Sequence, residues 1–196
     1  MNATPILKYT AEEYLELEEV SLEKNEYYKG EIFAMAGASI PHNQIVANSL
    51  IEIGSFLKDK KCRIFPSDLR IHAISNSLFT YPDLSIICNE IETFGKRKST
   101  VTNPSVLIEV LSKTTQDYDR GAKFKLYRDI ESLKEYILIS SLETLVEKYD
   151  KQTDGSWVLH EYKTTTDTFT ITSIGLLITV QDLYRDVDFE NVGETA

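Results

Sequence analysis

The chain has 196 residues, of which 42% are hydrophobic and 27% charged, with 21 lysines and arginines against 31 acidic residues. The composition is that of a globular protein, and a chain of this length can bury a hydrophobic core. We therefore predict a single domain over residues 1–196, whose central part spans about residues 9–185, and exclude extensive disorder. The chain has no apolar run of the roughly 18 residues that a membrane helix needs, so we expect no transmembrane helix. Met1–Thr10 has one lysine and no apolar block, so we expect no signal peptide either. The net charge of −10 argues against general polyanion binding, although a local basic groove or a bound cation can outweigh it.

The two cysteines, Cys62 and Cys88, lie in different segments and form no Cys-x-x-Cys motif. Their pattern fits neither a zinc site nor a disulfide framework, so we expect two reduced cysteines in a cytoplasmic protein. The three histidines have no ligand spacing, so a histidine-rich metal site is not expected.

Hydrophobic periodicity, capping residues and turn residues predict the elements of the first half of the chain. In order, they are a helix over Ala11–Glu18, a strand over Tyr27–Met35, a helix from about Pro41 to Lys58, and an interrupted strand pair over Arg63–Phe65 and Leu69–Ala73.

The second half is read in the same way. Its expected elements are buried strands over Asp83–Cys88, Ser105–Leu111 and Glu135–Ser140, a long loop over Asn89–Asn103, a helix over Asp117–Ile130, a hairpin over Leu145–Tyr149 and Trp157–Tyr162, a strand over Thr168–Ile171, and a helix over Val180–Arg185. This order predicts an α/β fold in which helices flank a mixed central sheet and a β-rich extension follows.

Glu109 is the most informative residue, because it stands in the apolar run Val106-Leu-Ile-Glu-Val-Leu111. A carboxylate buried in a central strand is costly unless it is paired, protonated or bound to a metal. Glu109 is therefore either a functional acid or half of a structural ion pair with a lysine or arginine.

Asp83 stands at the start of another apolar strand, directly after Pro82. A Pro-Asp pair alone usually marks a turn. Together with Glu109 on a neighbouring strand, however, it forms a set of hard oxygen ligands suited to Mg²⁺ or Mn²⁺.

Asp119, Lys123 and Tyr127 are four residues apart in the helix that follows the Glu109 strand, so they share one helix face. From there Lys123 can point at the strand ends and meet a phosphate. The alternative is a solvated ion pair between Asp119 and Lys123.

The pattern of Pro82-Asp83, a spacer and then Glu109 in a buried strand resembles the PD-(D/E)XK nuclease superfamily. More specifically, the chain resembles a bacterial group of restriction endonuclease-like proteins, formerly a domain of unknown function, that is expanded in cyanobacteria. The matching stretches run through about residues 9–184 and are Tyr27-Tyr-Lys-Gly-Glu31-Ile, His42-Asn43, Ser67-Asp68-Leu-Arg70, Tyr81-Pro-Asp83, Asn103-Pro104, Glu109-Val-Leu-Ser112, Tyr118-Asp-Arg-Gly-Ala-Lys123-Phe, Tyr127-Arg128 and Glu135-Tyr136.

The resemblance implies a restriction endonuclease-like α/β/α sandwich in which Asp83, Glu109 and the main-chain carbonyl of Val110 ligate the cation. The usual motif lysine, two residues after the second acid, is replaced here by Leu111, and Lys123 is placed to compensate by stabilising phosphate charge or helping to deprotonate water. The resemblance also places Glu31 as an acid from the N-terminal region, although a surface strand carboxylate fits it as well.

Further candidates have weaker signals. His42 is either a site contact or a helix-start hydrogen bonder. Asp68 and Arg70 alternate on one face of the expected strand, where they either support the metal site or bind phosphate, or else form a structural pair; Asp119 is a further supporting candidate. Lys96, Arg97 and Lys98 either contact DNA or are solvated surface.

We therefore expect a metal-dependent endonuclease that acts on DNA as a C2 homodimer, because cutting both strands of a duplex usually needs two subunits. Two alternatives remain open at this point. One is an inactive nucleic-acid binding or assembly protein on the same fold, and the other is a hydrolase of a small phosphoester or an RNA end.

Overall fold

The computed structural model describes residues 8–189. Its helical segments are α1 (Ala11–Val20), α2 (Ile40–Leu57), the 3₁₀ helix η1 (Ile74–Asn76), α3 (Gln116–Tyr118), the one-turn π-helix η2 (Asp119–Lys123), α4 (Phe124–Tyr127) and α5 (Val180–Leu183). None of the described helices is long and apolar enough to cross a bilayer.

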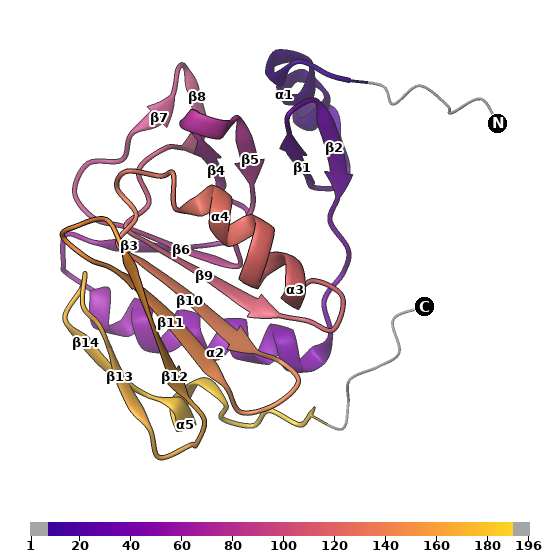
Figure 1. The fold of residues 1–196 in the computed structure, drawn as a ribbon. Coiled ribbons are helices and arrows are strands. Elements are labelled where there is room, and N and C mark those ends of the chain that lie inside the picture. The colour runs from indigo at the N-terminus through magenta and orange to yellow at the C-terminus, as the bar shows by residue number, and fades with distance from the viewer. Residues whose placement is uncertain (1–7, 190–196) are drawn as a thin grey trace.

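The strands form two six-stranded sheets and one hairpin (Figure 1). The first sheet has the order β2 (Glu31–Ala34), β1 (Asn25–Tyr28), β5 (Leu78–Thr80), β4 (Arg70–Ala73), β8 (Arg97–Val101) and β7 (Thr93–Phe94). The second has the order β12 (Trp157–Tyr162), β11 (Val146–Lys151), β10 (Glu135–Ser140), β9 (Val106–Leu111), β6 (Leu84–Ile87) and β3 (Arg63–Pro66). The hairpin is β13 (Thr168–Ile171) with β14 (Leu176–Thr179).

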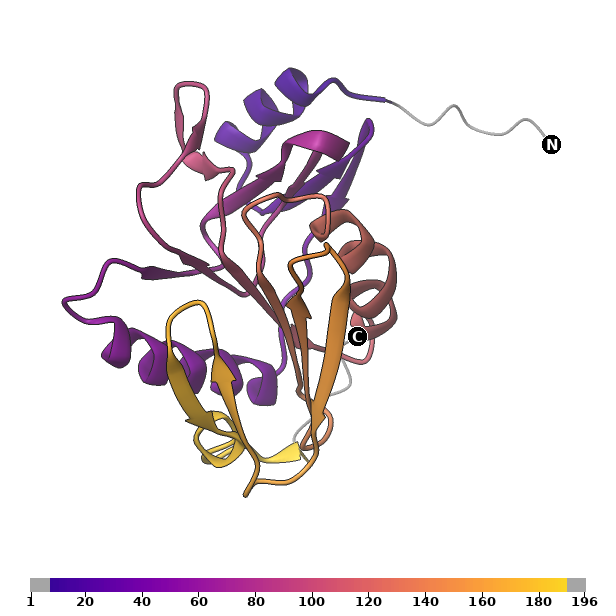
Figure 2. The ribbon, with the colours of Figure 1, turned by 60° about the vertical axis from the view of Figure 1, so that its left-hand side comes forward.

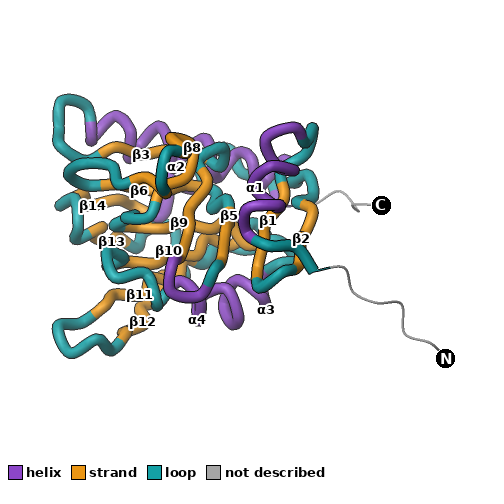
Figure 3. Tube along the Cα trace, turned by 90° about the horizontal axis from the view of Figure 1, so that it is seen from above, coloured by secondary structure: helices purple, strands orange, loops and turns teal. Residues whose placement is uncertain are grey.

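The second sheet is mixed, because β9 and β10 pair in parallel whereas its other described pairs are antiparallel. Figures 2 and 3 show α2 on one side of this sheet and the segment from α3 to α4 on the other. The predicted mixed α/β fold is thus confirmed, and so are the helix near residues 41–58 and the hairpin of β11 and β12.

Alternation along β9 assigns its side chains to two separate cores. Val106, Ile108 and Val110 pack in the core that includes α2, whereas Leu107 and Leu111 pack in the core that includes α4. Glu109 lies between Leu107 and Leu111 in this alternation, so its carboxylate faces the α4 side. This is the face from which a helical lysine can approach.

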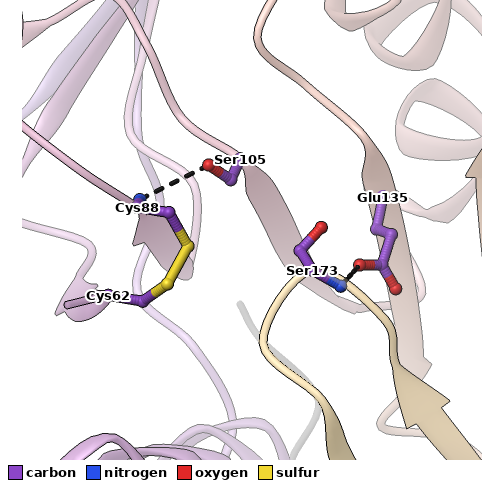
Figure 4. The surroundings of a disulfide bond; sticks show 5 residues. All are labelled: Cys62, Cys88, Ser105, Glu135 and Ser173. Carbon is purple, nitrogen blue, oxygen red and sulfur yellow. Dashed lines mark hydrogen bonds between the residues drawn. A yellow bond between two sulfur atoms is a disulfide. The ribbon is translucent and has the colours of Figure 1, made fainter. Parts of the chain in front are cut away.

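The C-terminal extension is held to the second sheet by Glu135 of β10. The Glu135 carboxylate accepts the backbone N–H groups of Thr172 at 2.9 Å and Ser173 at 2.6 Å, the second of which Figure 4 shows. Lys148 lies 2.8 Å from the same carboxylate and is itself buried. Charge and hydrogen bonds are therefore satisfied at the junction between the sheet and the β13–β14 hairpin.

Three expectations about the strands are wrong. The segment 27–35 is a hairpin rather than one strand, because the chain turns at Lys29 and Gly30, which have positive φ angles of 48° and 98°. The predicted pair near residues 63–73 is split between the sheets, with β3 in one and β4 in the other. The expected loop over 89–103 contains β7 and β8.

The expectation of two reduced cysteines is also wrong, since Cys62 and Cys88 form a disulfide (Figure 4). Arg63 of β3 pairs with Ile87 of β6 in antiparallel register, so the cysteines are the next cross-strand neighbours beyond this pair. Disulfides are rare in cytosolic proteins, so a cytoplasmic location stays a prediction.

Replacing both cysteines, as Cys62→Ser with Cys88→Ser, is expected to lower the free energy of unfolding by about 2–4 kcal/mol, because the bond restricts the unfolded chain. Urea denaturation with and without dithiothreitol measures this. Reduction should bring the wild type to the midpoint of the double variant and leave the variant unchanged. A wild type that is insensitive to reductant would contradict the prediction.

Candidate active site

Adjacent antiparallel strands bring Asp83 and Glu109 together. Leu84 of β6 is the register partner of Ile108 of β9, so Asp83 and Glu109 are the next pair along. The Asp83 N–H donates to Glu109 Oε2 at 3.4 Å, and the Val110 N–H donates to Asp83 Oδ2 at 2.7 Å. The two predicted acids therefore lie side by side at one end of the central strands.

Lys123 reaches this pair from the helical segment on the α4 side of the sheet. Its Nζ lies 2.9 Å from Glu109 Oε1, 3.3 Å from Glu26 Oε1 and 3.6 Å from Asp119 Oδ1. The Lys123 side chain is only 7% exposed and that of Asp119 only 5%. The Asp119–Lys123 pair is thus buried, so the alternative of a solvated ion pair does not describe it.

Burial and charge shift the pKa values in this cluster. Burial raises the pKa of Glu109, which the Lys123 ammonium opposes, and burial likewise raises the pKa of Asp119. Burial alone would lower the pKa of Lys123, but the carboxylates of Glu109, Glu26 and Asp119 outweigh it and raise that pKa well above its ordinary value. Lys123 is therefore a cation at neutral pH, but its single charge does not offset the burial of Glu109, whose pKa is raised to about 8.

Two hydroxyl groups complete the shell around the lysine. Tyr127 Oη donates to Glu109 Oε1 at 2.7 Å and lies 3.2 Å from Thr80 Oγ1, while the Thr80 hydroxyl also donates to Glu26. Glu109 Oε1 thus accepts a hydrogen bond from Tyr127 and forms an ion pair with Lys123. Within residues 8–189, Oε2 of the same carboxylate accepts only the long hydrogen bond from the Asp83 N–H.

His42 approaches Asp83 from the opposite side, near the start of α2. The helix is capped by Ser39, whose hydroxyl accepts the His42 N–H at 3.4 Å. The His42 Nε2 lies 3.2 Å from Asp83 Oδ2, and its Nδ1 is buried without a hydrogen-bond partner among the described residues. His42 is therefore both a helix-start residue and a neighbour of the Asp83 carboxylate.

The donor set fits a hard divalent cation held by few protein ligands. Residues 8–189 contain no group of three or more histidine, cysteine, aspartate or glutamate side chains arranged to hold a metal ion. Mg²⁺, however, usually takes one or two carboxylates and keeps several waters. Asp83 and Glu109 supply two adjacent carboxyl groups, and a bound cation would favour the ionised form of Glu109, whose pKa burial raises.

A family model of known proteins matches residues 11–181; the family is Uma2, described as "Putative restriction endonuclease". The chain belongs to this family. The resemblance inferred from the sequence motifs is thereby confirmed, and the Uma2 match covers the strands of Asp83 and Glu109 together with the Lys123 helix.

Relatives of this Uma2 chain occur in Synechocystis sp. (strain PCC 6803). The chain is 38% identical over 189 residues to "Uncharacterized protein slr1290", covering 95% of this chain and 97% of the relative. It is 39% identical over 152 residues to "Uncharacterized protein sll1609", covering 78% and 86% respectively. The names of these two relatives do not state an activity.

A solved structure from Anabaena variabilis ATCC 29413, described as "a putative nuclease belonging to DUF820", superposes with a TM-score of 0.74. The two proteins are 21% identical, and the superposition covers 90% of this chain and 97% of that one. At this identity the match supports the fold alone, and that fold agrees with membership of the Uma2 family.

The N-terminal strands contribute one acid to the cluster around Lys123, and this acid is Glu26 of β1 rather than Glu31 of β2. Glu31 lies in β2 opposite Tyr28, and no contact places it beside Lys123 within the described residues. Glu26 was missed because the sequence suggested a strand beginning at Tyr27. The alternation of Glu26 and Tyr28 around the buried Tyr27 is the signal that could have found it.

Asp68 and Arg70 do not share a strand face, which corrects that expectation. Asp68 lies in the turn before β4 with a side chain that is 87% exposed, and it pairs with Lys24 at 3.0 Å. Arg70 is buried and donates from Nε to Thr100 Oγ1 at 2.9 Å and from Nη1 to Tyr81 Oη at 3.1 Å. Arg70 thus joins the strands of the first sheet.

The basic run at residues 96–98 belongs to the β7–β8 hairpin. Arg97 pairs with Glu12 and Glu19 of α1, so its charge holds the hairpin to that helix. Lys96 and Lys98 are exposed. Contact of these three residues with DNA stays a prediction.

Proposed function

We propose that this protein is a divalent-metal-dependent nuclease that hydrolyses phosphodiester bonds in DNA. The observation that carries the proposal is the adjacency of Asp83 and Glu109 on neighbouring strands, with Lys123 at 2.9 Å from the second acid. Membership of a restriction endonuclease-like family supports the same reading.

Asp83, Glu109 and the main-chain carbonyl of Val110 are the groups that would hold Mg²⁺ or Mn²⁺. When bound, the metal polarises a phosphoryl oxygen and lowers the pKa of an attacking water. Lys123 places a fixed positive charge where negative charge develops on the phosphate. Glu26, Asp119 and Tyr127 orient the lysine and Glu109, and His42 holds the Asp83 carboxylate.

A catalytically inactive nucleic-acid binding protein is the second candidate. Leu111 favours it, because this residue takes the usual place of the motif lysine and is buried in the core beside α4. Against it, Lys123 delivers an ammonium to Glu109 from the following helical segment. The homodimer expected for a double-strand cut stays a prediction, which sedimentation equilibrium can check.

The test is Mn²⁺ titration by calorimetry together with plasmid nicking in Mg²⁺ or Mn²⁺. We expect the wild type to bind Mn²⁺ and to nick supercoiled plasmid, with EDTA abolishing the nicking. Asp83→Asn should weaken Mn²⁺ binding by more than about 100-fold, since loss of even a supporting residue at metal sites costs 10- to 100-fold.

The matched control is Asp68→Asn, the same change at an exposed aspartate whose partner among the described residues is Lys24 rather than Asp83 or Glu109. It should bind Mn²⁺ like the wild type. A wild type that binds neither metal would overturn the proposal, and metal binding without any nicking would favour the inactive candidate.

A further inference from the structure

A second feature of the structure is a hollow of about 440 Å³ on the protein surface. It shares two elements with the acidic cluster, by which we mean Glu26, Glu109, Asp119 and the Lys123 that they surround. It is bounded by the β1–β2 turn, η1, the end of α4 and the β11–β12 turn, and Figure 2 shows the last of these beside the α4 segment. The lining residues that matter here are Tyr28, Lys29, Asn76, Lys125, Arg128 and Trp157.

The hollow is basic although the whole chain is acidic. Lys29, Lys125 and Arg128 are exposed, and none of them makes an ion pair with any residue in the described range 8–189. The nearby acid is Asp129, whose carboxylate accepts the Asn76 amide at 3.1 Å. Among the residues that line the hollow, three cations stand against one hydrogen-bonded carboxylate, which makes the hollow attractive to an anion in spite of the net charge of −10.

The hollow also carries aromatic rings held in place by packing. Trp157 is half-buried and meets the Phe124 ring edge-on with 5.3 Å between centroids, while the Arg128 guanidinium lies 5.2 Å from the centroid of the same ring. Tyr28 is half-buried as well, with the Lys29 ammonium 5.2 Å from its ring centroid. Aromatic faces beside cations are the means by which proteins bind unpaired nucleotides, stacking the base and pairing the phosphate.

Two elements connect the hollow with the acidic cluster. Along β1, Glu26 faces the cluster and Tyr28 comes two residues later on the same strand face, about 7 Å further on. In the helical segment, Lys123 belongs to the cluster and Lys125 lines the hollow. The hollow and the candidate active site are therefore built on the same two elements, β1 and the α4 segment.

We infer that the hollow binds an unpaired nucleotide, with its base against Trp157 and Tyr28 and its phosphate on Lys29, Lys125 and Arg128. The protein then binds single-stranded nucleic acid more tightly than a blunt duplex. This goes beyond the proposed function, because such binding requires neither metal nor cleavage.

Trp157 makes the inference directly measurable, because it is the single tryptophan of the chain. The full chain is titrated in EDTA with an oligothymidylate of about 12 nucleotides, a length within the usual range of single-strand sites, and its fluorescence is followed. The oligonucleotide should quench the fluorescence with an affinity that falls as salt is raised. Blunt duplex of the same length should bind at least about tenfold more weakly, and inorganic phosphate alone should not quench.

Lys125→Glu is the diagnostic variant and Lys134→Glu its control, the same change at an exposed lysine outside the hollow. Lys125→Glu should weaken oligothymidylate binding by about tenfold or more, and Lys134→Glu by about twofold or less. Absence of quenching, equal quenching by duplex, or equal losses in the two variants would overturn the inference. Because EDTA removes metal-dependent cleavage from the experiment, such a failure would leave the nuclease proposal untouched, and loss of nicking would leave this inference untouched.

Discussion

Glu109→Gln is expected to lower plasmid nicking by at least about a thousandfold, because a metal-bound acid contributes several kcal/mol to the stabilisation of the transition state. The substitution keeps the volume of the side chain, and the amide oxygen can still accept from Tyr127 and Lys123. The variant should therefore stay folded while its cleavage is lost. Initial nicking rates, with circular dichroism as the check on folding, measure this.

Two glutamates of the N-terminal strands provide graded controls. Glu31→Gln, in β2 and without a contact to Lys123 among the described residues, should change the nicking rate by no more than about twofold. Glu26→Gln removes a carboxylate beside Lys123 and should cost about 10- to 100-fold, as supporting residues at metal sites do. Wild-type nicking by Glu109→Gln would refute the assignment of this acid.

Lys123→Met is expected to lower the free energy of unfolding by about 3–5 kcal/mol, because removing one partner of a buried ion pair leaves uncompensated charge. The lysine is the cation that Glu26, Glu109 and Asp119 share. Methionine replaces the apolar stem of the side chain but none of its charge. Urea denaturation followed by circular dichroism gives the loss.

Lys125→Met is the matched control, since this lysine is exposed and lies two residues along the same helical segment. It should change the free energy of unfolding by about 0.5 kcal/mol or less. Lys123→Met combined with Glu109→Gln should cost less than the two single changes added together, because the residues touch. Strict additivity would argue that Lys123 and Glu109 do not interact.

The elements that local sequence patterns determine were predictable. Glu109 could be singled out because it is the one acid in the apolar run of β9. The helical spacing of Asp119, Lys123 and Tyr127 predicted the helix face from which Lys123 contacts Glu109. We expected Asp83 and Glu109 on neighbouring strands because each belongs to a short apolar run, and the register of β6 and β9 agrees with this.

Features that depend on an unusual backbone conformation or on contacts between distant residues were not predictable. The β1–β2 turn could not be predicted from the sequence, because Lys29 adopts a positive φ angle, which residues other than glycine rarely do. The roles given to Asp68 and Arg70 assumed that both residues lie on one strand face, whereas Asp68 lies in the turn where the chain passes from β3 in one sheet to β4 in the other. The disulfide requires the pairing of β3 with β6, and the spacing of the two cysteines gives no indication of that pairing.

The bond between Cys62 and Cys88 closes a covalent ring that contains β3, β4, β5 and β6. Because β4 and β5 belong to one sheet while β3 and β6 belong to the other, the ring passes through both sheets and includes Asp83. A protease that cuts the backbone anywhere inside the ring would leave the two fragments linked, and they would separate only under reducing conditions. Asp83 and the strand β6 that follows it are thus connected to the rest of the molecule through sulfur as well as through the peptide chain.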